Sequence, residues 1–179
     1  MLKKALYSTL TLSMLMTMQA CSTVTPGVDH SSSYTLASNA RVVVVPFYNT
    51  SDTESAGATA AIMTSSELQI KHIEVANIPF RDHKKMKHNE YRNMSARCAW
   101  AKDHNISYIM KGSINEWGYI KGSTGEVPVV AMTMQLRDTS TCKIVWNAVG
   151  NKTETSAISA SGTAQRLIST MVNSLNGSN

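Results

Sequence analysis

Runs of apolar residues, and regular alternation of apolar with polar residues, divide most of the chain into strands and helices. The run RVVVVPFYNTS at 41–51 contains four consecutive valines and predicts a strand buried on both faces. Met94, Cys98 and Ala101 follow helical spacing and share one helix face. In chain order the patterns predict strands at 41–51 and 72–79, helices at 54–71 and within 80–105, strands at 106–122, 127–138 and 140–150, and a helix at 159–175.

The order of these elements is β-α-β-α-β-β-β-α. It predicts an α+β fold, resembling an α/β sandwich, in which helices pack on a mixed sheet and the second half forms an antiparallel meander. Residues 41–176 are enough for one domain with an ordinary core.

The first residues have the pattern of an export signal. Lys3 and Lys4 are followed by an uncharged stretch at 5–20, which is too short and too rich in Ser and Thr for a comfortable membrane span. The small residue before Cys21 predicts a lipoprotein signal peptide at 1–20, with Cys21 as the acylated first residue of the mature chain. An ordinary cleaved signal or an uncut anchor, with Cys21 incidental, is the alternative.

The segment after this cysteine is rich in Ser and Thr. We therefore expect 21–40 to be the lipidated residue and a flexible tether. Removal of Lys3 and Lys4 leaves 15 of the 17 basic residues against 12 acidic ones, so the formal charge falls from +5 to +3. In a periplasmic protein this weak basic balance argues against a nucleic-acid partner.

Two further cysteines, Cys98 and Cys142, lie in different predicted elements. In an oxidising compartment they can form a disulfide. The alternative is that each is a small buried apolar residue.

Sequence motifs for catalysis or metal binding are absent. No Gly-rich phosphate loop follows a predicted strand, and no Cys-x-x-Cys or His-x-x-x-His spacing suits a metal. No serine lies in a nucleophile elbow. We therefore expect a protein that is not an enzyme and has no metal or cofactor.

Two aromatic residues in the meander carry the most functional information. Strict alternation from Ile114 places Trp117 and Tyr119 on the opposite face of their strand. They either pack under a helix or hairpin, or form a subunit or membrane contact, because amphipathic aromatic side chains favour such borders.

The second half of the chain resembles the PelC family of outer-membrane lipoproteins, which serve Pel exopolysaccharide export. The family pattern is Gly-Ser-x-x-Glu-Trp-x-Tyr-Lys, then Gly-Glu-Pro, a strand ending Leu-x-Asp, Val-x-Trp-x-Ala-x-Gly, and a closing helix. The matching residues are Gly112, Ser113, Glu116, Trp117, Tyr119, Gly125, Glu126, Leu136, Asp138, Val145, Trp146, Ala148 and Gly150. The resemblance covers 41–175 and is most specific after Tyr108.

This resemblance implies a non-enzymatic protein on the periplasmic face of the outer membrane. Members of the family form a dodecameric ring beside an export porin and guide a cationic polysaccharide toward the pore for the biofilm matrix. An acidic lining would concentrate such a polymer, and Glu116, Glu126 and Asp138 are the candidates for it. Ser22 after the lipidated cysteine favours the outer membrane.

One family feature has no counterpart here. In the family an aromatic residue after the last strand helps to seat the ring on the membrane, whereas 151–159 contains no aromatic residue. Trp117, Tyr119 or the acyl chains would then make this contact. The alternative function is a tethered lipoprotein that activates a cell-wall synthase or belongs to another secretion apparatus.

Overall fold

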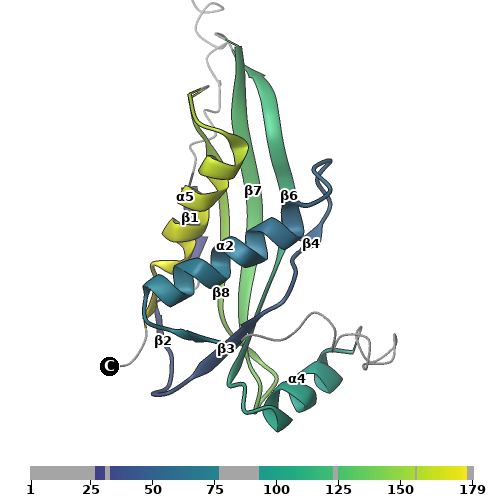
Figure 1. The fold of residues 1–179 in the computed structure, drawn as a ribbon, viewed down its shortest axis with the longest axis vertical. Helices are drawn as coiled ribbons and strands as arrows, with labels where there is room; N and C mark the ends of the chain where they lie inside the picture. Colours follow the sequence, from purple (N-terminus) through teal and green to yellow (C-terminus); the bar gives the residue numbers. More distant parts are fainter. Residues whose placement is uncertain (1–26, 31–32, 77–92, 123–124, 156, 177–179) are drawn as a thin grey trace, which may run out of the picture.

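The structure is a computed structural model that describes residues 27–30, 33–76, 93–122, 125–155 and 157–176. The predicted signal peptide and Cys21 lie outside these residues. A mixed sheet forms the centre of the molecule, and helices pack on it, so the predicted α+β class is confirmed (Figure 1).

The elements follow the predicted order, with short additions at both ends. The helices are α2 (Ala56–Ile70), α4 (Met94–Asp103) and α5 (Ala160–Val172). The strands are β1 (Gly27–His30), β2 (Tyr34–Thr35), β3 (Arg41–Val44), β4 (Tyr48–Asn49), β5 (Glu74–Val75), β6 (Tyr108–Gly122), β7 (Gly125–Asp138), β8 (Ile144–Thr153) and β9 (Leu175–Asn176).

The main sheet has the strand order β1-β8-β7-β6-β3-β5, and β4 also pairs with β6. The β6–β7–β8 meander is antiparallel, as predicted, whereas β3, β4 and β5 join in parallel. A separate parallel pair joins β2 to β9. The two chain ends of the domain are therefore held together.

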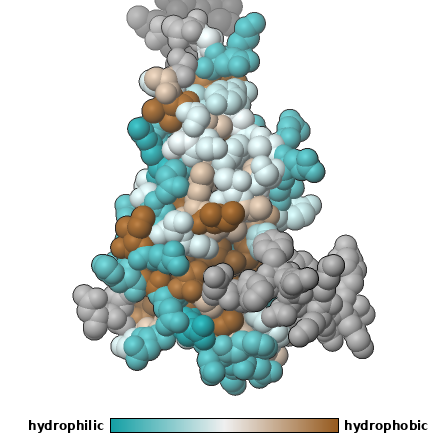
Figure 2. Space-filling view, viewed as in Figure 1, coloured by the Kyte–Doolittle hydropathy of each residue, from teal (hydrophilic) through white to brown (hydrophobic). Residues whose placement is uncertain are grey.

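Helices α2 and α5 cover one face of the sheet and enclose the main core. Strand β7 alternates because Val130, Met132, Met134 and Leu136 all point to this face and are buried. Figure 2 shows brown hydrophobic atoms among pale ones on this helix-bearing side. Helix α4 packs on the other face at one end, where Ile109 meets Cys98 and Ala101.

A disulfide joins Cys98 of α4 to Cys142 of the β7–β8 turn. Of the two alternatives for these cysteines, the structure has the bridge. The bridge links residues 44 positions apart and fastens a short helix with few buried residues to the sheet.

The segment expected to be a tether is partly folded into the domain. Gly27–His30 pairs with β8, Tyr34–Thr35 pairs with β9, and Leu36 is buried in the main core. A flexible tether over the whole of 21–40 is therefore wrong for the described residues. The cause is a free edge of β8 that β1 completes, an interaction through backbone groups that side-chain composition does not reveal.

Candidate functional site

The β6–β7 hairpin extends well beyond the helices at one end of the molecule (Figure 1). Its register shifts between Ile114 and Glu116, so Asn115 is an extra residue without a partner on β7. Such a β-bulge reverses the alternation of side chains beyond it. The predicted assignment of faces therefore fails from Glu116 onward.

The bulge turns Trp117 toward the helix-bearing face. Its side chain is only 5% exposed and belongs to the main core. The Thr53 hydroxyl also donates a hydrogen bond of 2.7 Å to the Trp117 carbonyl oxygen. In a single chain Trp117 is thus a core residue, so of the two alternatives for it the structure has packing under the helices and not a membrane or subunit contact.

Tyr119 lies on the same face, beyond the core, and is 52% exposed. Its hydroxyl oxygen accepts a hydrogen bond of 3.2 Å from the Ala160 amide at the start of α5. Ile120, on the opposite face, is also exposed. Tyr119 therefore remains available as a contact residue near the hairpin tip.

The three acidic candidates lie at three different levels of the hairpin. Glu116 is exposed beside the bulge, Glu126 is exposed near the tip opposite Lys121, and Asp138 ends β7 at the other end. Twelve residues of strand separate the last two, a distance of about 40 Å. The structure does not bring the three carboxylates together within one chain.

Asp138 has a structural task in the β7–β8 turn. One carboxylate oxygen accepts hydrogen bonds from the Ser140 hydroxyl at 2.6 Å and from the Thr141 amide at 2.8 Å. Burial raises the pKa of this carboxyl, but these hydrogen bonds outweigh burial and hold the pKa below its ordinary value. The Asp138 carboxylate is thus already hydrogen-bonded to residues of its own turn.

Beyond α4, no described element covers the sheet face that lies opposite α2 and α5. We call the part of this face between α4 and the hairpin tip the open face. It carries mostly small and weakly polar side chains in rows across the strands, and one row runs through Tyr48, Ser113, Thr133 and Val149 to Asp29 of β1. Tyr48 is 71% and Val149 51% exposed. Sequence reasoning missed this face because alternation shows which residues share a face, but not whether a helix covers it.

Basic residues gather at the α4 end of the open face. Lys111 and Arg137 project from neighbouring strands on that face, and Arg97 of α4 lies close enough to act on Lys111 electrostatically. Burial lowers the pKa of the Lys111 ammonium, and the charges of Arg137 and Arg97 lower it further. The Arg137 guanidinium donates to the Cys142 carbonyl oxygen, which fixes its position.

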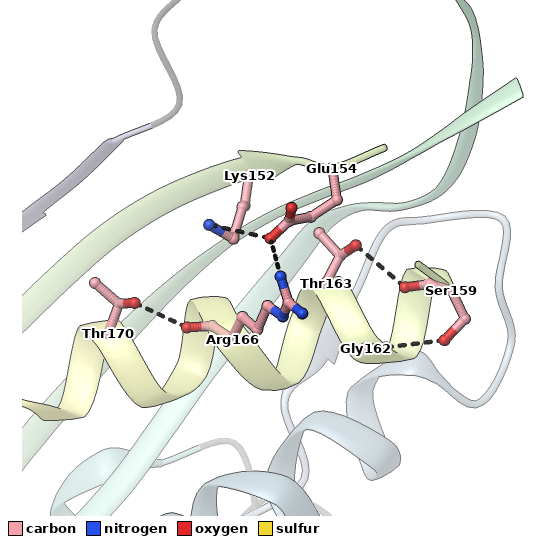
Figure 3. Close-up of polar contacts among 7 residues, drawn as sticks. All are labelled: Lys152, Glu154, Ser159, Gly162, Thr163, Arg166 and Thr170. Carbon is pink, nitrogen blue, oxygen red and sulfur yellow. Dashed lines mark hydrogen bonds and ion pairs between the residues drawn. The ribbon is translucent and has the colours of Figure 1, made fainter. Parts of the chain in front are cut away.

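The segment after β8 is fastened to α5 (Figure 3). Glu154 forms ion pairs with Lys152 at 3.2 Å and with Arg166 at 3.3 Å. Ser159 then caps α5 by accepting a hydrogen bond of 3.0 Å from the Gly162 amide. The described part of this segment is therefore bound to the domain itself through Glu154 and Ser159.

The described residues contain no group of three or more His, Cys, Asp or Glu side chains placed to hold a metal ion. None of the helices in the described part of the chain is long and apolar enough to span a membrane.

Comparison with known proteins finds no family model and no curated sequence that match the chain. Among solved structures, a PelC dodecamer from Paraburkholderia phytofirmans is 27% identical with a TM-score of 0.65, over 84% of this chain and 98% of that one. A variant PelC dodecamer from the same organism is 29% identical with a TM-score of 0.68, over 83% of this chain and 96% of that one.

The chain has a PelC-like fold. PelC is matched over nearly its whole length, so the likeness extends to the complete domain and not to one motif. Lipoprotein GNA1162 from Neisseria meningitidis shares the fold at 20% identity and a TM-score of 0.57, over 75% of this chain and 96% of that one. The fold is thus shared with a protein described as a lipoprotein.

Proposed function

We propose that this chain is a non-enzymatic outer-membrane lipoprotein that assembles into a periplasmic ring and guides a cationic exopolysaccharide, Pel, to its export porin. The observation that carries the proposal is the PelC-like fold, matched over 98% of a chain that was crystallised as a dodecamer. The PelC-type motif around Glu116, Trp117 and Tyr119 supports it from the sequence.

The anchor of this ring is an acylated Cys21. One acyl chain binds a membrane only marginally, but a lipidated cysteine repeated around a ring holds firmly through multivalency. Substitution Cys21→Ala should move the protein from the outer-membrane fraction to the soluble periplasm, as measured by fractionation and immunoblotting.

The acidic lining is assigned to Glu116 first and Glu126 second. Glu116 is exposed and faces Ala131 across the strand pair, so no opposite charge lies beside it there. Glu126 lies opposite Lys121, which offsets its charge. Asp138 is the weakest of the three candidates because its carboxylate is hydrogen-bonded within its turn.

The experiment that tests the ring is mass photometry and negative-stain imaging of the full-length lipidated protein, extracted from outer membranes in mild detergent. The expected result is closed rings with a mass close to that of twelve subunits. A clean monomer at micromolar concentration would contradict the proposed function.

A further inference from the structure

The outward face of α2 is unusual for a solvent-facing helix. Ala58, Ile62, Ser66 and Ile70 follow one another at intervals of four residues, so they form a single stripe. Ile62 is 68% and Ile70 is 69% exposed. The helix has one charged residue, Glu67, and this side chain is buried, where it accepts a hydrogen bond from Gln165 of α5. Exposed helix faces in single-chain proteins are normally charged or polar.

The open face of the sheet has matching properties. Glu116 lies beside the bulge, and Asp29 ends the row at the edge strand β1. The positions of that row between Tyr48 and Asp29 are uncharged, and Val149 among them is about half exposed. A helix packed on a sheet is the arrangement that α2 and α5 already make on the other face. At 15 residues α2 is about 22 Å long, which is close to the length of open face that six or seven strand residues provide. Depletion of charge is the compositional mark of an interface centre.

Opposite charges lie at corresponding ends of the two surfaces. Asp52 and Glu54 are exposed just before α2, and neither carboxylate has a hydrogen bond or ion pair with another described residue. The open face ends at Lys111 and Arg137, beside Arg97 of α4. A carboxylate brought to this basic end would offset the repulsion among its cations.

We propose that α2 of one copy of this chain packs on the open face of the next copy, with Asp52 and Glu54 against Lys111 and Arg137. The inference rests on the proposed ring, and it names the two surfaces that build it. The contact uses two different surfaces on opposite sides of the molecule, so it is heterologous. Each copy engages one neighbour through α2 and another through the open face, and such contacts build a ring when the rotation from copy to copy closes on itself.

The test uses one variant for each surface in the full-length lipidated protein. Ile62→Glu with Ile70→Glu blocks the α2 stripe and leaves the open face intact. Tyr48→Glu with Val149→Glu blocks the open face and leaves α2 intact, because both exposed side chains lie in the row on which α2 would pack. Each variant alone should lower the fraction of protein in rings at least about tenfold. An equal mixture of the two should give a 1:1 dimer, since one good contact remains.

Ser161→Glu is the matched control, because Ser161 is an exposed helical position at the start of α5, outside both surfaces. The control should keep its rings. Circular dichroism melts should show that all variants fold, since every substituted side chain is exposed. Rings that survive in either double variant, while the unsubstituted protein also forms rings, overturn the inference and leave the proposed function standing. A monomeric unsubstituted protein overturns both.

Disulfide trapping is a second measurement, and it does not require that a substitution disrupt the contact between copies. Cys98 and Cys142 are already bonded to each other, so an added cysteine is free to react. A Ser66→Cys chain mixed with a Val149→Cys chain and mildly oxidised should give a covalent dimer of one of each. Neither chain alone should form it. Self-linking of the Ser66→Cys chain would instead show a symmetric helix-to-helix contact and overturn the inference.

Discussion

Asn115 is an extra residue in β6, and this single insertion decides the task of the aromatic residue two positions later. Beyond Asn115 the side chains exchange faces, so Trp117 enters the core beside Val130 while Glu116 points to the open face. The motif residues Glu116 and Trp117 thus serve opposite sides of the sheet. Glu116 is therefore the surface residue to which the proposed function assigns a role, and the Trp117 indole belongs to the core between the hairpin and the helices.

Trp117→Ala is expected to be strongly destabilising. Loss of a buried indole leaves a cavity and should lower the free energy of unfolding by about 3–5 kcal/mol. Tyr119→Phe removes one hydrogen bond to Ala160 and should cost only about 0.5–1.5 kcal/mol. Urea titration of both variants, read by circular dichroism, measures the difference. Equal small losses would show that the indole is not packed in the core.

Helix α2 begins where β3 and β4 pass closest to it, and Gly57 makes that approach possible. A Cβ atom at Gly57 would lie 2.2 Å from the Phe47 carbonyl oxygen, and the Gly57 carbonyl oxygen accepts a hydrogen bond from the Phe47 amide. By helix propensity alone, alanine at this position would stabilise the helix by about 1 kcal/mol. The clash is with backbone, which has no easy way to move.

Gly57→Ala should therefore destabilise the protein, because overpacking of about 1–3 kcal/mol exceeds the gain in propensity. Thermal unfolding should show a lower Tm than the unsubstituted chain. Ser66→Ala, on the exposed face of the same helix, is the control, and propensity predicts a small rise in stability for it. A higher Tm for Gly57→Ala would mean that the start of α2 and the backbone at Phe47 can move apart without loss of stability.

Helix α4 depends on the Cys98–Cys142 bridge more than the other helices depend on any one contact. Cys98 and Ala101 are its only fully buried residues among those described. The loop closed by the bridge spans 44 residues, and its loss should cost about 2–4 kcal/mol. Cys98→Ala combined with Cys142→Ala should therefore lower the urea midpoint. Reduction of the unsubstituted protein with dithiothreitol should reproduce the effect, and no change in either case would contradict it.

The long periodic elements could be predicted from the sequence because their burial follows one period throughout. The helix predicted at 54–71 is Ala56–Ile70, and the strand predicted at 127–138 is Gly125–Asp138. The strand Gly27–His30 was hidden because it binds through backbone groups and has a composition typical of a tether. The bulge at Asn115 was hidden because one inserted residue leaves local composition unchanged while it reverses every later position. For this reason the face predicted for Trp117 was wrong.

At the level of the whole molecule, the substitution Glu116→Lys tests most directly whether the protein guides a cationic polymer. The residue is exposed, so the reversal should change the free energy of unfolding by no more than about 0.5 kcal/mol. It replaces attraction with repulsion for a cationic polymer, and secreted Pel should fall several-fold. Quantification of matrix polysaccharide, with protein level and ring formation measured in parallel, separates guidance from assembly. Glu116→Gln should give an intermediate loss, and unchanged secretion in both would argue against Glu116 as a lining residue.

If Cys21 is acylated as proposed, strand β1 also determines which end of the molecule faces the lipid. It runs antiparallel to β8 and thus in the same direction as β7, so its first residue points toward the hairpin tip. Six residue steps from Gly27 back to Cys21 reach at most about 20–22 Å. From the level of Gly27, the tip is about 20 Å away and the Asp138 turn lies farther in the other direction. With Cys21 acylated, the hairpin and its exposed Tyr119 and Ile120 stand toward the bilayer, and α4 with its disulfide extends into the periplasm.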